Sequence, residues 1–223
     1  MSQPSGGKAR KPRRFAPLIV VAGLVGALAM SLAMTNTLSA FIATIVNTND
    51  TAAAGSVVLQ EANADASTTC SSDSTNVSTN SSNCATINKY GGSTTMVPTN
   101  ANATSNLVTT TVNFKNTGSS AATAFTMGFG ACTQSNNGAK NGTATDYCSK
   151  LHVKVMSGST VVQADTTAAA LANTTVTLAA AQIPAAASGS TVPFTFTTYL
   201  DTSAGNTYQG LSASQPITWT LSS

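Results

Sequence analysis

The chain has 223 residues, of which 42% are hydrophobic and 8% are charged. This length can bury one substantial core, and so little charge excludes disorder driven by charge repulsion. Five of the ten basic residues lie within the first 14 positions, which leaves five basic against seven acidic residues and no basic surface for nucleic acid.

A basic segment followed by an apolar run opens the chain. Phe15–Met34 contains no ionisable side chain, and about 20 helical residues are enough to cross a hydrocarbon core. Such a pair of segments is typical of a secretory signal, although the length of the apolar run leaves an uncleaved membrane anchor as an alternative. In both cases the basic end stays inside and the rest of the chain is exported.

Small residues mark two sites where a signal peptidase could cut, Ser31–Ala33 and Thr37–Ser39. The second site places the cut between Ser39 and Ala40. We expect this second cut, so that the exported protein begins at Ala40.

A short apolar stretch begins at Ala40 and ends at Val46. Both of its faces are apolar, as in a strand that is buried on both sides, and the polar stretch Asn47–Ala54 that follows can act as a hinge. We therefore expect a donor strand, which leaves its own sandwich and completes a sheet of the next subunit. The alternatives are that it stays in its own domain or continues the signal helix across the membrane interface. The donor-strand residues are Ala40, Phe41, Ile42, Ala43, Thr44, Ile45 and Val46.

Strands are predicted along the rest of the chain. Apolar and polar residues alternate in short runs between Gly, Asn and Ser turns, which is the signature of strands. One Ala-rich run, Thr166–Ala172, is expected to form a turn or two of helix. The predicted strands are Ser56–Leu59, Leu107–Asn116, Ala124–Phe129, Leu151–Met156, Thr160–Gln163, Thr174–Leu178, Val192–Leu200 and Ser214–Ser222.

Many short strands without helical crossovers predict an all-β, antiparallel β-sandwich. We expect this single domain in residues 40–223. A signal or transmembrane helix in residues 1–39 precedes it.

Four cysteines lie in the exported part, and an even count in an exported chain predicts disulfides. Three pairings are possible, and we favour the local ones, Cys70–Cys84 and Cys132–Cys148, because each pair brackets a polar stretch that nothing else holds. Each bridge would close a loop of about 15 residues and stabilise the fold by about 3 kcal/mol. A metal site is disfavoured, since no CxxC pair occurs and the chain has one histidine.

Catalytic motifs are missing from the sequence. The one histidine, His152, falls on the solvent face of its predicted strand, and there is no HExxH, GxSxG or glycine-rich phosphate loop. The acidic residues are scattered, so no glycosidase pair can be chosen. Asp65 and Asp73 could hold calcium in a polar loop, but a solvated loop is the simpler interpretation. We expect no enzyme activity, no cofactor and no metal.

Three parts of the chain carry a resemblance to a known family. In the first part, Thr37–Phe41 followed by Gly55–Leu59 has the family's order of a cleavage site, the dipeptide Ala-Phe, a polar stretch and a strand. In the second part, Val112–Ser119 is similar to a family strand that ends in N-x-G-S/T. In the third part, Ala204–Gly210 and Thr218–Thr220 are similar to the family's C-terminal motif, N-x-Y-Q-G followed by an aromatic residue. The chain thus resembles the TasA/camelysin family of secreted proteins with SipW-type signal peptides. The cysteine-bracketed loops and the Ala-rich stretch have no counterpart in that pattern.

The resemblance implies a jelly-roll-like sandwich and a role as a fibre subunit of the cell surface or biofilm matrix. Some relatives have been described as metalloproteases, an activity that this chain lacks the histidines to support. The expected partners are other copies of the chain, as a homopolymer, and other matrix or cell-wall components. The alternative function is a membrane-tethered binding or adhesion module at the cell surface, which keeps its N-terminal helix. Contact with the membrane is expected only through that segment.

Overall fold

The computed structural model of the chain describes residues 51–223, apart from residue 139 and residues 187–189. Within it, Ala53–Ser223 form one compact unit. The predicted signal segment, its cleavage site and the donor strand lie outside the described residues. No helix in the described part of the chain is long and apolar enough to cross a membrane.

The larger sheet has the strand order β2-β1-β4-β10-β7-β8, and all neighbours in this order run antiparallel. β3 adds a short parallel pairing at the end of β10. The strands of this sheet are β1 Leu59–Asn63, β2 Thr69–Ser71, β3 Pro98–Thr99, β4 Val108–Asn116, β7 Leu151–Ser157, β8 Thr160–Thr167 and β10 Val192–Asp201.

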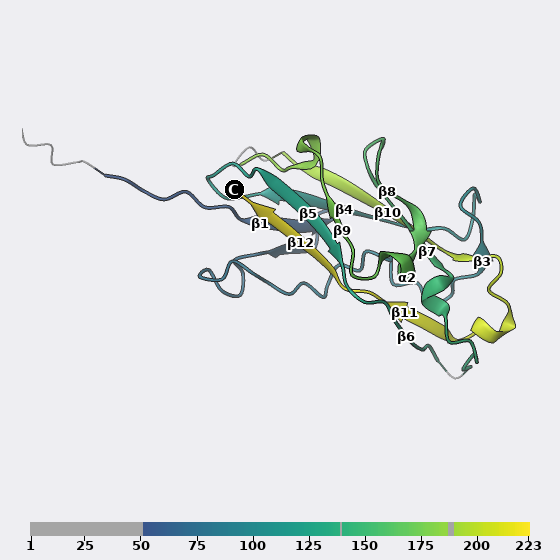
Figure 1. Ribbon diagram of the computed structural model, residues 1–223. Helices are drawn as coiled ribbons and strands as arrows, with labels where there is room; N and C mark the ends of the chain where they lie inside the picture. The colour runs from purple at the N-terminus through teal and green to yellow at the C-terminus, as the bar shows by residue number, and fades with distance from the viewer. Residues whose placement is uncertain (1–50, 139, 187–189) are drawn as a thin grey trace, which may run out of the picture. The chain divides into compact units, whose positions relative to one another are not determined.

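A three-stranded sheet in the order β12-β5-β9 packs against the larger one, and β11 pairs with β6 in a separate two-stranded sheet (Figure 1). These strands are β5 Ala124–Phe129, β6 Thr133–Asn136, β9 Thr175–Thr177, β11 Leu211–Ser214 and β12 Ile217–Ser222. The helical segments are short: η2 Tyr147–Ser149, α2 Ala168–Leu171, η3 Ala180–Gln182 and η4 Asn206–Tyr208.

Aromatic side chains from both sheets fill the space between them. The ring centroid of Phe114, on β4, lies 5.5 Å from that of Phe125 on β5 and 5.7 Å from that of Phe194 on β10. All three side chains are fully buried, and burying each one contributes roughly 1.5–3 kcal/mol. Alternation along each strand turns these residues toward the core and their neighbours toward solvent. The all-β antiparallel sandwich predicted from the sequence is therefore confirmed.

The first strand begins later than the sequence predicts. A strand was expected at Ser56–Leu59, but β1 covers Leu59–Asn63. Ser56 lies instead against the turn that follows β4, where its carbonyl oxygen accepts a hydrogen bond of 2.8 Å from the Ser120 N–H. Gly118 of that turn passes so close that a Cβ atom there would lie 2.2 Å from the Ser56 carbonyl oxygen.

Four short strands are not predicted by the sequence, whereas the three-residue β9 lies within the predicted strand Thr174–Leu178. β2, β3, β6 and β11 are two to four residues long and mostly polar, so they carry little alternation. β8 continues to Thr167, beyond its predicted end at Gln163. Thr167 then caps the helical turn expected in the Ala-rich run, because its hydroxyl oxygen accepts a hydrogen bond of 3.2 Å from the Ala170 N–H.

Candidate functional site

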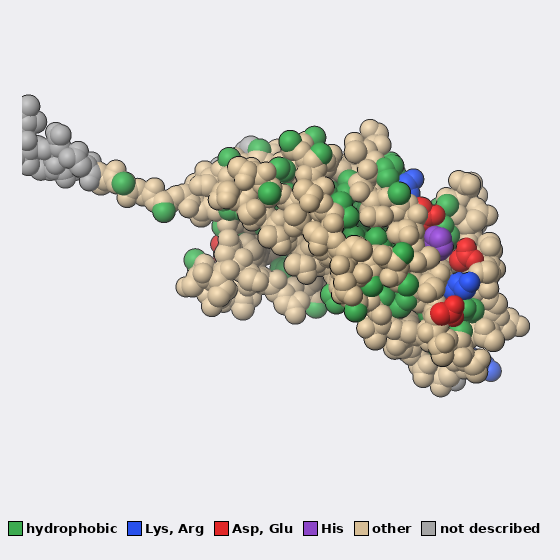
Figure 2. All heavy atoms as spheres, in the orientation of Figure 1, with side chains coloured by type: hydrophobic (Ala, Val, Ile, Leu, Met, Phe, Trp, Pro, Cys, Tyr) green, Lys and Arg blue, Asp and Glu red, His purple; other side chains and the backbone are tan. Residues whose placement is uncertain are grey.

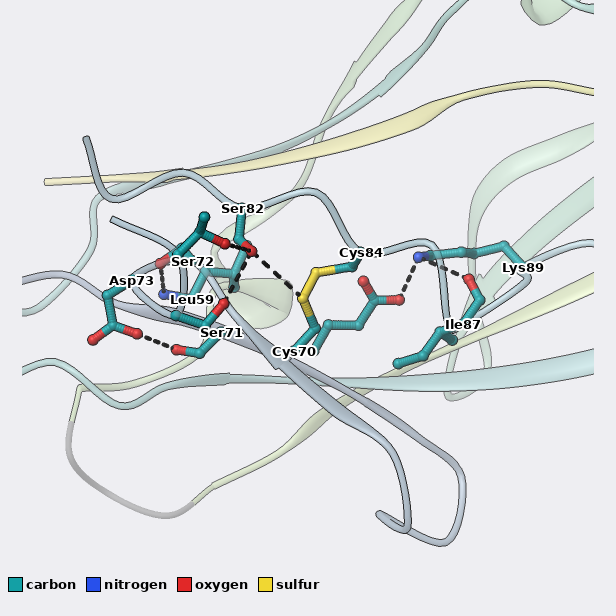
Figure 3. The surroundings of a disulfide bond; sticks show 12 residues. Leu59, Cys70, Ser71, Ser72, Asp73, Ser82, Cys84, Ile87 and Lys89 are labelled. Carbon is teal, nitrogen blue, oxygen red and sulfur yellow. Dashed lines mark hydrogen bonds and ion pairs between the residues drawn. A yellow bond between two sulfur atoms is a disulfide. The ribbon is translucent and has the colours of Figure 1, made fainter. Parts of the chain in front are cut away.

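The structure joins Cys70 to Cys84 and Cys132 to Cys148, the two local pairings favoured by the sequence. The second disulfide holds η2 to the segment between β5 and β6. The first holds β2 to a long irregular segment (Figure 3). Two disulfides are typical of a protein that works in an oxidising, extracellular environment.

That irregular segment, residues 84–97, is here called the strap, because it runs between the first disulfide and β3 without a helix or strand. Ile87 of the strap packs into the core with 7% of its surface exposed, and Tyr90 and Met96 pack against the same core. Gly91 makes this close approach possible: its φ is +77°, and a Cβ atom there would lie 2.2 Å from Val108 Cγ1.

A groove of about 1320 Å³ lies between the strap and the sandwich. Its lining includes Phe114, Trp219 and Ile217 of the sandwich and Ile87 and Tyr90 of the strap. The rest of its lining mixes Ser, Thr, Asn and Gln with further apolar residues and glycines, and the charged residues are limited to Glu61 and Lys89. An apolar floor with an uncharged polar rim is a surface suited to a neutral, partly apolar chain.

β12 forms one wall of this groove and has a free edge. It pairs with β5 on one side, and within the described residues no strand pairs with its other side. Its core-facing side chains, Ile217, Trp219 and Leu221, stay half-buried, whereas those of β5 are buried. The indole N–H of Trp219 is buried without a hydrogen-bond partner in the described part of the protein. β12 is therefore an edge strand whose inward-facing side chains are only partly covered.

A buried ion pair connects the strap to β1. Lys89 Nζ lies 2.5 Å from Glu61 Oε1, and both side chains are about nine-tenths buried, with 10% and 8% of their surfaces exposed. Lys89 also donates a hydrogen bond of 3.2 Å to the carbonyl oxygen of Ile87. Burial raises the pKa of Glu61 above its usual value, although the Lys89 ammonium acts in the opposite direction. Sequence reasoning missed this pair, because neither residue belongs to a recognisable motif.

A second hydrogen bond fixes the middle of the strap. The Tyr90 hydroxyl donates to Gln215 Oε1 at 2.6 Å, and Gln215 lies two residues before Ile217, the first residue of β12. Gln215 in turn donates through its amide nitrogen to the carbonyl oxygens of Gly130 and Ala168. The strap is thus tied to the strand that carries the free edge.

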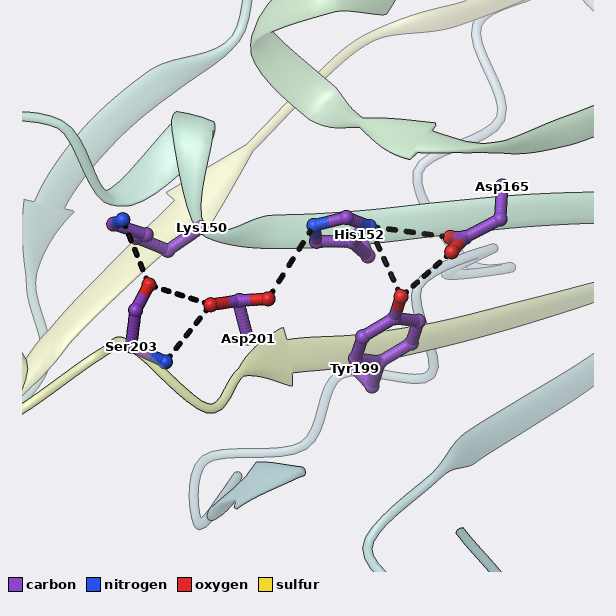
Figure 4. A network of polar contacts seen from close by, with 6 residues as sticks. All are labelled: Lys150, His152, Asp165, Tyr199, Asp201 and Ser203. Atoms are coloured by element: carbon purple, nitrogen blue, oxygen red, sulfur yellow. Dashed lines mark hydrogen bonds and ion pairs between the residues drawn. The ribbon is translucent and has the colours of Figure 1, made fainter. Parts of the chain in front are cut away.

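A polar cluster surrounds His152 on the outer face of the larger sheet (Figure 4). The imidazole stacks on the Tyr199 ring, with centroids 4.7 Å apart, and its Nδ1 lies 3.2 Å from Asp165 Oδ1. The Tyr199 hydroxyl donates to Asp165 Oδ2 at 2.6 Å. Burial, followed by this hydrogen bond and the Asp165 charge, raises the pKa of Tyr199. His152 therefore faces outward as predicted, but it has partners on β8 and β10.

Asp201 completes this cluster from the end of β10. Its Oδ2 lies 3.9 Å from His152 Nε2, and its other oxygen accepts hydrogen bonds from the Ser203 hydroxyl and N–H. Figure 2 shows that charged side chains of this face gather around the chain's one histidine, at one end of the domain. No group of His, Cys, Asp and Glu in the described residues is arranged to hold a metal ion.

Asp65 and Asp73, the candidate calcium ligands, make separate local contacts. Asp65 Oδ1 accepts hydrogen bonds from the Ser67 N–H and hydroxyl, and these bonds lower its pKa. Asp73 Oδ1 accepts from the Ser71 hydroxyl at 2.5 Å. Each carboxylate therefore closes a turn of its own loop.

No protein-family model matches the chain, and neither does any curated protein sequence. Its function is therefore inferred from the groove, from the free edge of β12 and from the sequence that precedes the domain.

Proposed function

We propose that the chain is an exported structural protein, the subunit of a cell-surface or biofilm-matrix fibre that assembles by donor-strand exchange. In this proposal Ala40–Val46 of one subunit adds to the free edge of β12 in the next subunit. Main-chain hydrogen bonds supply affinity, and alternate side chains fill the groove. Each subunit gives one strand and accepts one, so the contact is head-to-tail, and in this proposal its rotation does not close into a ring and a filament grows.

The observation that carries this proposal is the free edge of β12. An unpaired edge presents a row of N–H and C=O groups, which is a template for another strand. Ala40–Val46 is one residue longer than the six residues of β12, so the two segments can pair along nearly their whole length. The half-buried side chains Ile217, Trp219 and Leu221 lack the neighbour that an added strand would supply.

The chemistry of the groove also fits this segment. Ala40–Val46 contains no charged residue, and the charged residues that line the groove, Glu61 and Lys89, neutralise each other. Phe114 and Trp219 offer an aromatic surface to an apolar side chain such as Phe41. The buried indole N–H of Trp219 would find an acceptor in the main chain of an inserted strand.

The resemblance to the TasA/camelysin family supports the same proposal, because it implies a secreted fibre subunit. Secretion is further supported by the two disulfides and by the basic and apolar leader. The proposed location is therefore the cell surface or the extracellular matrix, with the chain itself as its main partner.

The test is negative-stain microscopy of the exported protein, with and without residues 40–46. The exported protein should form filaments, and the deletion variant should stay monomeric. A matched control replaces Asn47 and Asn49 by Ser, which alters the hinge and leaves the donor strand intact; this variant should still form filaments. Filaments of normal length from the deletion variant would contradict the proposal.

Mass spectrometry of the exported N-terminus separates the two candidate functions. A chain that starts at Ala40 supports the fibre, because the donor strand is then free. A chain that keeps the basic leader and stays monomeric supports the membrane-tethered binding module instead.

A further inference from the structure

The strap occupies part of the space beside the free edge of β12. Ile87, Tyr90 and Met96 point their apolar side chains at the core cluster, and all three line the groove. The strap therefore supplies apolar contacts at the same place where the proposed donor strand would insert.

The strap is held firmly at its two ends. Cys84 is joined to Cys70 of β2, and Pro98 and Thr99 pair with the end of β10 as β3. These anchors bind the strap to the larger sheet, which does not carry the free edge.

Between its ends the strap has few contacts of its own main chain. In the described part of the protein, its one hydrogen bond between main-chain atoms runs from the Gly91 N–H to the Asn88 carbonyl oxygen. Two strap carbonyl oxygens also accept hydrogen bonds from side chains of the sandwich: that of Tyr90 from the Thr198 hydroxyl at 3.4 Å, and that of Thr94 from the Asn137 amide at 3.1 Å. Side chains hold the rest, through the Lys89–Glu61 ion pair and the hydrogen bond from Tyr90 to Gln215. Segments with few main-chain hydrogen bonds open at a lower free-energy cost than core strands, and irregular segments of this length are often functional. Opening the strap also separates Lys89 from Glu61 and exposes Ile87, so the contacts of an entering donor strand have to replace theirs.

We infer that the strap is a displaceable cover of the acceptor groove: it closes the groove in the free subunit and swings away about its two anchors when a donor strand enters. This inference rests on the proposed function and adds a regulatory step to it. Loss of the hydrogen bond from Tyr90 to Gln215 frees the strap from β12, because Gln215 lies two residues before Ile217, the first residue of that strand. Subunits are therefore protected from premature pairing until a donor strand competes with the strap.

The test is hydrogen exchange of the exported protein, measured by mass spectrometry before and after polymerisation. In the polymer, peptides from β12 should exchange more slowly, and peptides covering residues 85–97 should exchange at least about tenfold faster. Slower exchange in β12 with unchanged exchange in the strap would overturn the cover and leave the fibre proposal standing. Unchanged exchange in β12 would overturn both.

A single hydroxyl provides the kinetic test. Tyr90→Phe removes the hydrogen bond to Gln215 and keeps the ring, so it should speed polymerisation about two- to tenfold, the range that one net hydrogen bond supports. The matched control is Tyr199→Phe, which removes a hydroxyl that also donates at 2.6 Å but lies in the His152 cluster. The control should polymerise at the parent rate. A Tyr90→Phe variant that polymerises no faster than this control would overturn the cover.

Discussion

The ring of Trp219, on the edge strand β12, lies with its centroid 4.3 Å from that of Phe114 on β4. Phe114 is fully buried, whereas Trp219 is half-buried and lines the groove. One aromatic contact therefore connects the most enclosed part of the core to its open side. The stability of the domain and the shape of the groove therefore depend on the same pair of rings.

Phe114→Ala should destabilise the domain by about 3–5 kcal/mol, because it opens a cavity where both sheets meet. Denaturant unfolding of the exported protein checks this value. Val77→Ala is the matched control, since 79% of the Val77 surface is exposed and exposed substitutions change stability by less than about 0.5 kcal/mol. A loss below about 1 kcal/mol for Phe114→Ala would contradict a core centred on this ring.

Removing the second disulfide, by Cys132→Ser with Cys148→Ser, should cost about 3 kcal/mol. The physical reason is that the bridge closes a loop with a sequence separation of 16, so its loss restores entropy to the unfolded chain. Unfolding by urea, with the parent under non-reducing conditions, measures the difference. A peptide map that joined Cys132 to a cysteine outside this pair would refute the pairing on which the prediction depends.

The long strands could be predicted from the sequence because each carries its own signal. In β4, β5 and β10, large apolar residues alternate with Thr, and a phenylalanine marks the inward face. β1 lacked this signal, because its sequence LQEAN contains a glutamate. Glu61 faces the core only because Lys89 reaches it from the strap, and 28 positions of sequence separate the two residues.

The His152 cluster could have been found with one more step. The predicted strands Leu151–Met156 and Thr160–Gln163 are separated by a short turn, and continuing the second strand past Gln163 brings Asp165 back to His152. The strand was ended too early, because its exposed residues show no apolar alternation. The groove left no such signal, since the residues that line it come from the strap, β12 and other segments that are far apart in the sequence.

The contribution of Glu61 to the free energy of unfolding should fall as the pH rises from about 4 toward neutrality. The pKa of Glu61 is raised above its usual value of 4.5 by burial, so the folded state binds this proton more tightly than the unfolded state. Its contribution is fully present below the usual pKa and is lost as the pH rises through the raised pKa. Urea unfolding of the parent and of Glu61→Gln, at pH values from about 3.5 to about 7, measures the difference in their free energies of unfolding. This range extends from below to well above the usual carboxyl pKa. A difference that is constant across this range would show that Glu61 titrates normally.

Lys89→Met should destabilise the domain strongly, by about 3–5 kcal/mol near neutral pH, because it leaves the Glu61 charge buried without its partner. The double variant Lys89→Met with Glu61→Leu should recover much of this loss, since an apolar pair of similar size needs no compensation. Thermal unfolding of the two variants and the parent makes the comparison. Equal stability of the single and double variants would contradict a buried, coupled pair.

Trp219→Phe should separate the stability of the free subunit from that of the fibre. Among the residues that the structure describes, the indole N–H has no hydrogen-bond partner, so its removal costs no hydrogen bond there, and phenylalanine keeps most of the contact with Phe114. In the fibre, by contrast, the inserted donor strand would give this N–H an acceptor, and a net hydrogen bond contributes about 0.5–1.5 kcal/mol. We therefore expect nearly unchanged urea unfolding of the monomer and a critical concentration for polymerisation that rises about two- to tenfold. Sedimentation of polymer at a series of protein concentrations measures the critical concentration. If Trp219→Phe raised it no more than Val77→Ala does, Trp219 would not contact the donor strand through its indole nitrogen.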